Sequence, residues 1–219
     1  MSAKAIIFDA YGTLFDVNSA AEKCKDKIGD KWEGFAGFWR TTQLEYTWLR
    51  SLMKRHKDFW KITEESLDKS MRVFNIDNAM RNELLNLYKT LSLYPEVKEV
   101  LDNLKKRNYK LSILSNGTPA LLNELVKSNN LENIFDDLFS IEEVGVYKPH
   151  SKVYEIPIKK YKINSDEIVF LSANTWDVSG GGNYGYKSIW VNRNKAIFDN
   201  LDYKPKNEIS NLSQLLDII

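Results

Sequence analysis

Short, largely apolar runs recur along the chain, each stopped by a polar or turn-forming residue, at 5–8, 111–114, 138–141, 168–171 and 188–191. Runs of this length that are rich in β-branched residues are typical of strands buried on both faces of a sheet. Helical periodicity separates them, at 95–106, 119–127 and 153–160, and Pro95 and Pro119 each suit the first turn of a helix. The alternation predicts an α/β fold, with a Rossmann-like core whose parallel sheet is flanked by helices and joined by right-handed crossovers.

The segment from about residue 17 to residue 92 interrupts this rhythm, because it shows helical periodicity and no convincing buried strand. We therefore expect an all-helical cap of residues 16–92, inserted into a core made of residues 1–15 and 93–219. The large apolar residues of the insertion have two interpretations. The favoured one is that they form the insertion's own core, and the other is that they form a partly exposed face over a pocket or a partner subunit. These positions are Phe35, Phe38, Trp39, Trp48, Leu49, Leu52, Phe59 and Trp60.

The Asn- and Lys-rich stretch at 192–211 predicts a solvated surface segment that leads to a final helix. The charges nearly balance, with 31 basic against 30 acidic residues, which argues against a nucleic-acid binder and favours a small substrate or a neutral partner. With 43% hydrophobic and 28% charged residues, the composition excludes a disordered chain.

The cysteine content and the N-terminal segment bear on the compartment. The single cysteine, Cys24, cannot form an internal disulfide, and no Cys/His cluster offers the ligands of a structural zinc site. The first apolar run is too short for a signal-peptide core or a membrane span. We therefore expect a soluble protein of the reducing cytoplasm.

Polar residues follow the predicted strands. In an open parallel sheet the ligand site lies beyond the carboxyl ends of the strands, so these residues are the candidates for chemistry. A buried carboxylate next to a lysine and among hydroxyl and amide donors stays ionised, which makes Asp9 a candidate nucleophile. The set comprises Asp9 with Thr13 one turn later, Ser115 and Asn116, Lys148, and Ser172, Asn174 and Asp177.

Four segments resemble, in the correct order, the four motifs of the haloacid dehalogenase superfamily, at 8–16, 115–117, 148–149 and 172–177. Within the predicted cap, residues 39–40 and 43–50 resemble the cap helix of the type II L-2-haloacid dehalogenases, and the resemblance spans essentially the whole chain. It implies a Rossmann-like core with a helical cap that closes over the ends of the strands.

Tyr11 separates two activities within that superfamily. The phosphatases carry a second aspartate at this position, two residues after the nucleophile, to protonate the leaving alkoxide. Halide needs no proton to leave, so an aromatic residue here fits displacement of a good leaving group from carbon and fits phosphate-ester hydrolysis poorly. Asp177 stands where the phosphatases hold magnesium, yet Lys148 and the resemblance imply a site with no metal and no other cofactor.

The resemblance implies hydrolytic dehalogenation of short (S)-2-haloacids to (R)-2-hydroxyacids, with inversion, through an ester on Asp9. Arg40 then favours the departing halide electrostatically, and Asp177 with Ser172 and Asn174 positions the water that hydrolyses the ester. The implied substrate-binding residues are Ser115, Asn116 and Lys148 for the carboxylate, and Tyr11, Leu44, Phe59 and Trp176 for the apolar wall.

Thr13 and Tyr154 complete the implied catalytic set. The implied partner is a small-molecule 2-haloacid, with neither nucleic acid nor membrane, and a homodimer is expected from the family alone. Two other functions stay open at this point. One is a magnesium-dependent small-molecule phosphatase of the same superfamily, and the other is a non-catalytic protein that binds through the aromatic face of the cap.

Each candidate residue also has a purely structural explanation. Asp9 suits a turn, Ser115 and Asn116 suit a helix cap, and Asp177 suits a helix N-cap. The corresponding explanations make Lys148 an ordinary surface lysine and Arg40 a surface ion-pair partner.

Residues 180–185 match the nucleotide-binding pattern G-x-G-x-x-G, but the context rejects that interpretation. These glycines lie well past the end of their strand, and no acidic residue follows the next strand near Asn192 to hold a ribose. Compared with the resembled family, this helix is unusually rich in glycine, and Ala173 stands where a second serine is more common.

Overall fold

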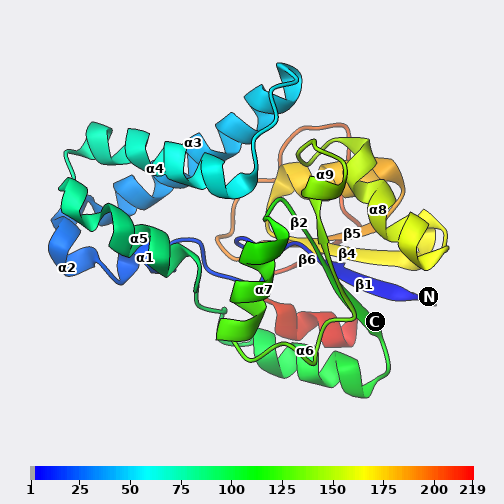
Figure 1. Cartoon of the computed structure of the whole chain (residues 1–219). Coiled ribbons are helices and arrows are strands. Elements are labelled where there is room, and N and C mark those ends of the chain that lie inside the picture. The colour runs from blue at the N-terminus through cyan, green and yellow to red at the C-terminus, as the bar shows by residue number, and fades with distance from the viewer. Residues whose placement is uncertain (1–2) are drawn as a thin grey trace.

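The computed structural model describes residues 3–219 and contains one sheet of six parallel strands, in the order β3-β2-β1-β4-β5-β6 (Figure 1). The central strand β1 pairs with β2 on one side and β4 on the other, and Phe8 lies opposite both Ile113 and Leu171. This register brings the carboxyl ends of the three strands to one level. The strands are β1 (Ala5–Phe8), β2 (Lys110–Ser115), β3 (Asp137–Ser140), β4 (Ile168–Ser172), β5 (Lys187–Val191) and β6 (Asn207–Ile209).

Helices cover both faces of this sheet. On one face lie α6 (Val97–Lys106), α7 (Pro119–Ser128) and the C-terminal 3-10 helix η5 (Leu212–Asp217), and on the other lie α8 (Ser151–Tyr161) and α9 (Thr175–Tyr184) (Figure 1). Every residue of β1 is buried, as its uninterrupted apolar sequence requires. The predicted Rossmann-like α/β core is therefore confirmed.

All five predicted strands are present, and Pro119 is the first residue of α7 as expected. Pro95 was wrong as a first-turn residue, because α6 begins at Val97 and Pro95 lies in the turn before it. The segment at 192–211 is mostly exposed, as predicted, but the prediction missed a strand within it. Its last part forms the edge strand β6, which pairs with β5 along residues 207–209, and the predicted final helix is present as the 3-10 helix η5.

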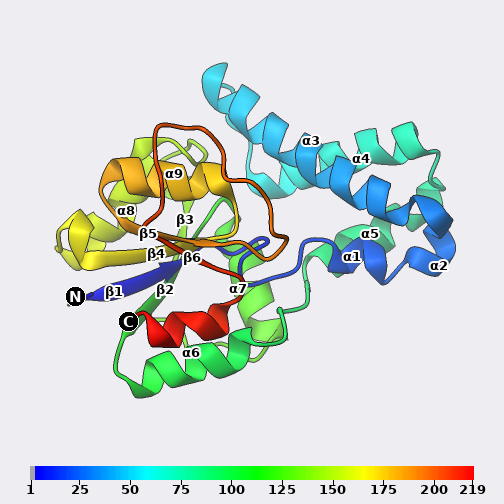
Figure 2. The same cartoon turned by 180° about the vertical axis from the view of Figure 1, so that it is seen from behind.

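Five α-helices lie between β1 and α6, beside the sheet rather than on its faces (Figure 2). The longest two, α3 and α4, run side by side. The chain leaves the core and returns to it along a short antiparallel contact, in which Phe15 bridges Leu93 and the Asp16 N–H donates to the Ser92 carbonyl at 2.8 Å. The helices are α1 (Ser19–Glu22), α2 (Lys25–Ile28), α3 (Trp32–Leu52), α4 (Phe59–Phe74) and α5 (Arg81–Tyr88).

The large apolar residues of this region are divided between two environments. Phe35, Trp39 and Phe59 are buried and form part of the common core, as the favoured interpretation predicted. Leu49 and Leu52, at the end of α3, are 50% and 80% exposed and form an apolar surface. The predicted burial therefore holds for part of this region, whereas the end of α3 is exposed.

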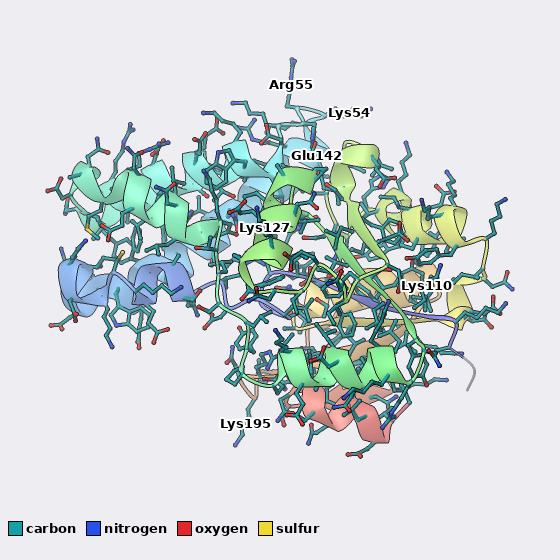
Figure 3. The ribbon with its side chains drawn as sticks, turned by 60° about the horizontal axis from the view of Figure 1, so that its bottom comes forward. Lys54, Arg55, Lys110, Lys127, Glu142 and Lys195 are labelled. Carbon is teal, nitrogen blue, oxygen red and sulfur yellow. The ribbon has the colours of Figure 1, made fainter. Side chains whose placement is uncertain are left out.

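The loop between α3 and α4 contacts the core. His56 Nε2 lies 2.9 Å from Glu142 Oε2, and the Tyr147 hydroxyl donates to the Lys57 carbonyl at 2.6 Å. Figure 3 shows Glu142 close to Lys54 and Arg55 of this loop. These contacts hold the tip of the α3–α4 pair against the loop that leads to α8.

Within residues 3–219, no helix combines the length and the apolar character that crossing a membrane requires. The side chain of Cys24 is buried.

Candidate active site

Asp9 lies directly after β1, and its two carboxylate oxygens have different surroundings. Oδ2 accepts hydrogen bonds from Thr13 Oγ1 at 3.0 Å, Asn174 Nδ2 at 2.9 Å and Ser172 Oγ at 3.4 Å. Oδ1 accepts one from Lys148 Nζ at 3.2 Å. The side chain is nearly fully buried, so these donors replace the water that a free carboxylate would bind.

Lys148 connects two carboxylates. Its Nζ lies 3.2 Å from Asp9 Oδ1 and 2.8 Å from Asp177 Oδ2, and its side chain is 0% exposed. An ammonium group that is buried in this way is stabilised only by such partners. The interpretation of Lys148 as an ordinary surface lysine is therefore wrong.

Asp177 is fully buried in the first turn of α9. Burial raises its pKa from 3.8 to about 6, and the Asp9 charge acts in the same direction, whereas Lys148 and the hydrogen bond from Tyr154 lower it. The Tyr154 hydroxyl donates to Asp177 Oδ1 at 2.7 Å. The N-cap of α9 is Asn174, so the alternative that made Asp177 the N-cap is wrong.

Ser115 is the last residue of β2 and Asn116 follows it, and both are buried. Asn116 Oδ1 accepts from the Lys148 main-chain N–H at 3.1 Å, and Ser115 Oγ accepts from the Gly117 N–H at 3.0 Å. The helix-cap interpretation of this pair is wrong, because Thr118 caps α7. Within residues 3–219 the Ser115 hydroxyl and the Asn116 amide donate to no other residue, so their hydrogen atoms are available to a ligand.

Arg40 reaches the core from α3. Its Nη2 donates to the Tyr11 carbonyl at 3.4 Å and its Nη1 to Gln43 Oε1 at 2.9 Å. No carboxylate within 4.0 Å pairs with its guanidinium in the part of the chain that the structure describes, so the surface ion-pair interpretation is wrong. The charge of Arg40 is therefore available to an anion at this side of the nucleophile.

Tyr11 lies between the two parts of the molecule. Its ring stacks on Tyr88 of α5 at 5.7 Å between centroids and packs against Phe59 of α4 at 5.2 Å. Its hydroxyl is buried and has no hydrogen-bond partner among residues 3–219. A Cβ on Gly117 would meet the Tyr11 hydroxyl, so this hydroxyl lies beside the loop that follows Ser115.

The remaining predicted wall residues occupy two positions. Trp176 packs edge-on against Trp48 of α3, with 5.5 Å between ring centroids, and so joins α9 to the helical segment. Leu44 is half-buried on α3, one turn after Arg40 and therefore on the same face of that helix.

Two residues of this site were missed at the level of sequence. Gln43 Nε2 donates to Thr63 Oγ1 at 2.7 Å and to the Tyr88 hydroxyl at 3.0 Å, and the Gln43 oxygen holds Arg40. Gln43 was part of the cap-helix resemblance, and a buried amide one turn after Arg40 was the available signal. Tyr88 carried no such signal.

The glycines of α9 lie inside the helix, which confirms the rejection of a nucleotide-binding loop. Each makes room for an aromatic ring. A Cβ on Gly180 would clash with the Tyr154 hydroxyl, one on Gly181 would lie 2.8 Å from Phe170, and one on Gly182 would clash with the ring of Tyr203. Ala173 stands where a serine is more common in the family, and its main-chain N–H donates to Thr13 Oγ1 at 2.8 Å.

Across residues 3–219, no group of three or more His, Cys, Asp or Glu side chains has the arrangement of a metal centre. Between Asp9 and Asp177, where two carboxylates could share a cation, the charge is supplied by the Lys148 ammonium.

Comparison with known proteins places this geometry in a family. Residues 3–185 match the sequence model of the haloacid dehalogenase-like hydrolases. The chain belongs to this family. It is 34% identical to (S)-2-haloacid dehalogenase 4A of Burkholderia cepacia, over 100% of this chain and 95% of that protein. It is 37% identical to the (S)-2-haloacid dehalogenase of Pseudomonas sp. (strain YL), over 98% and 94%.

Solved structures agree with the assignment of the chain to the haloacid dehalogenase-like hydrolases. The L-2-haloacid dehalogenase from Xanthobacter autotrophicus with chloropropionic acid covalently bound is 30% identical, with a TM-score of 0.90 over 98% of this chain and 97% of that one. A dehalogenase crystallised as an intermediate complex is 34% identical, with a TM-score of 0.97 over 100% and 97%.

Proposed function

We propose that this protein hydrolyses the carbon–halogen bond of short (S)-2-haloacids, giving (R)-2-hydroxyacids with inversion, through an ester on Asp9. The proposal rests on the different hydrogen-bond partners of the two Asp9 carboxylate oxygens. Three donors hold Oδ2, whereas Oδ1 accepts a single hydrogen bond and keeps a lone pair for attack. The relatives named (S)-2-haloacid dehalogenase and the covalently bound chloropropionic acid in a neighbouring structure support the substrate class.

In the first step, Asp9 attacks C2 from the side opposite the halogen, forming a C–O bond as the C–halogen bond breaks. The substrate carboxylate accepts hydrogen bonds from the Ser115 hydroxyl, the Asn116 amide and the Lys148 ammonium, which donates to Asp9 and Asp177 as well. The halogen departs as halide with the bonding electron pair, and no proton is needed.

Arg40 and the aromatic residues act on the leaving group and the side chain of the substrate. The Arg40 guanidinium favours the departing halide, since its charge has no carboxylate partner within residues 3–219. Tyr11, Leu44, Phe59 and Trp176 form the apolar wall that excludes water from this step.

In the second step, water attacks the carboxyl carbon of the Asp9 ester, and the hydroxyacid leaves with the oxygen that Asp9 supplied. Ionised Asp177 takes one proton from this water, which Ser172 and Asn174 position, and returns it to the alkoxide oxygen of the hydroxyacid as the bond to the Asp9 carboxyl carbon breaks. Tyr154 and Lys148 hold Asp177 in place through its two oxygens. Thr13 fixes the Asp9 carboxylate between the two steps.

We further propose that residues 16–92 act as a cap on a core of residues 1–15 and 93–219. The short contact between Phe15 and Leu93, where the chain crosses twice, supports these boundaries. A homodimer and a cytoplasmic location are part of the same proposal. The exposed Leu49 and Leu52 support the first, and the unpaired, buried Cys24 supports the second.

The direct test is release of halide from (S)-2-chloropropionate by the purified protein, with the (R)-enantiomer and a chromogenic phosphate ester with magnesium as comparisons. We expect halide from the (S)-acid and neither of the other two activities. Phosphate release that depends on magnesium and on Asp9 would establish the phosphatase instead. Binding without turnover, unchanged in Asp9→Asn, would establish the non-catalytic alternative.

A further inference from the structure

Arg193 lies in the loop after β5, outside the residues to which a role has been given. Its side chain is 11% exposed. Its Nη2 donates to the main-chain carbonyl of Thr13 at 2.8 Å, its Nη1 lies 2.7 Å from Glu96 Oε1, and its guanidinium lies over the ring of Tyr94 at 3.8 Å. One side chain thus contacts the nucleophile loop and the segment that returns from the cap.

The contact with Thr13 leads directly to the nucleophile. Thr13 Oγ1 donates to Asp9 Oδ2 at 3.0 Å and accepts from the Ala173 N–H at 2.8 Å. The orientation of this hydroxyl depends on the backbone of Thr13, and Arg193 holds that backbone through its carbonyl. Arg193 does not itself touch Asp9 or the site of the substrate.

The contacts with Tyr94 and Glu96 lead to the cap. The Tyr94 N–H donates to the Leu14 carbonyl at 3.1 Å, beside the contact of Phe15 with Leu93, so this is where both crossings between core and cap lie side by side. Glu96 Oε1 also accepts from the Leu212 N–H at 3.2 Å. Although burial opposes it, hydrogen bonds to Glu96 from its own main-chain N–H, from Arg193 and from the Leu212 N–H lower the pKa of this carboxyl, which keeps the ion pair charged.

We infer that Arg193 is a positioning residue, whose guanidinium holds the Asp9–Thr13 loop and both core–cap crossings in one arrangement and so sets the geometry of the nucleophile. The planar fork of arginine donates in two directions at once and stacks on an aromatic ring, which a lysine cannot do. The inference rests on the proposed function for its kinetic readout only.

The kinetic test compares Arg193→Gln and Arg193→Lys with Lys195→Gln, a matched loss of charge two residues along the same loop. Figure 3 shows Lys195 pointing away from the protein. For Arg193→Gln we expect kcat for (S)-2-chloropropionate to fall by about 10- to 100-fold with KM changed less than about threefold, because misplacement of a reacting group acts on the chemical step. Arg193→Lys should recover part of the loss, and Lys195→Gln should leave kcat within about twofold.

A double variant tests the route through Thr13. If Arg193 acts through this residue, Arg193→Gln adds less than about twofold to the loss in a Thr13→Ala background. An equal fold loss in both backgrounds, or an unchanged kcat in the single variant, would overturn the inference. If Arg193→Gln does not fold, Glu96→Gln replaces it, because it removes the charge that orients the guanidinium.

Amide hydrogen exchange tests the role of Arg193 without a measurement of enzyme activity. In Arg193→Gln, peptides covering residues 9–16 and 90–97 should exchange about tenfold faster or more, whereas Lys195→Gln should match the parent. Unchanged exchange in both peptides contradicts the inference. A parent protein that releases no halide contradicts the proposed function, and the exchange result then still tests Arg193.

Discussion

Lys148 is the residue on which the electrostatics of the site depend, because its buried ammonium is shared by Asp9 and Asp177. Lys148→Ala should lower kcat by about 100-fold or more, since loss of a preorganised charge at a reacting centre typically costs about 2.7–4 kcal/mol. It should also lower the free energy of unfolding by about 3–5 kcal/mol, because two buried carboxylates lose their partner. Halide-release kinetics and urea unfolding measure the two effects.

Lys152→Ala is the control for that variant, since Lys152 is exposed on α8 only four residues away. Its kcat and unfolding midpoint should match those of the parent. A Lys148→Ala protein with the parent's kcat would show that the ammonium has no part in the reaction.

The pKa of Asp177 predicts how kcat depends on pH on the acid side. Its pKa is raised to about 6, so the carboxylate that takes the proton of water forms as the pH rises through this value. We expect kcat to rise with pH around 6. Because the hydrogen bond from Tyr154 lowers this pKa, Tyr154→Phe should move the limb to higher pH.

The control for this shift is Tyr161→Phe, whose hydroxyl bonds Asp137 away from the site. It should leave the limb in place. A limb that moves to lower pH in Tyr154→Phe contradicts the assignment.

The raised pKa of Asp177 affects the stability of the fold in the opposite direction to its effect on kcat. Between pH 3.8 and about 6 the folded state binds more protons than the unfolded state, so the contribution of Asp177 falls as pH rises through this window.

At the residue scale, prediction from sequence succeeded where strand ends select the residues. Asp9, Ser172 and Asn174 meet because they follow adjacent parallel strands. Tyr154 and Arg40 lie on helices and entered only through the family resemblance. Tyr88 was missed because a hydroxyl that bonds across a helical segment leaves no local pattern.

At the scale of elements, α9 breaks the rules of helix propensity with three consecutive glycines, because rings occupy the space of their side chains. Gly180→Ala should push Tyr154 away from Asp177. We expect kcat to fall by about tenfold or more, and the free energy of unfolding to fall by about 1–3 kcal/mol from overpacking.

The matched variant is Gly37→Ala on α3, where a Cβ would meet nothing within 4 Å. It should raise the free energy of unfolding by about 0.5–1 kcal/mol, since an exposed helical glycine is less favourable than alanine, and leave kcat unchanged. Thermal unfolding and halide release on the two variants measure this contrast. Equal effects from the two substitutions would mean that the contact of Gly180 with Tyr154 has no special role.

Element boundaries were predictable where the apolar run was uninterrupted and every residue is buried, as in β1 and β4. The edge strand β6 was not, because Asn207 and Glu208 are exposed and only Ile209 is buried, so three residues carry almost no pattern. Pro95 was misplaced for a related reason, since proline also suits the turn before a helix.

At the scale of the whole molecule, the proposed site lies between the carboxyl ends of the strands and the helical segment, and each of these two parts contributes a positively charged side chain. Arg40 belongs to the helical segment and Lys148 to the core. Activity should therefore remain within about twofold in excess EDTA, because Lys148 provides the charge between the two carboxylates. Halide release before and after EDTA treatment measures this, and activity that needs added magnesium would contradict it.

The central claim is that Asp9 forms a covalent ester, and the source of the product's oxygen tests it most directly. A single turnover is run in ¹⁸O-water with enzyme in excess over (S)-2-chloropropionate, and the peptide that contains Asp9 and the hydroxyacid are both analysed by mass spectrometry. Because water attacks the carboxyl carbon of the ester, we predict ¹⁸O in the Asp9 side chain and an unlabelled hydroxyacid. Label found only in the first-turnover product would mean that water attacks C2 itself, and would contradict the account.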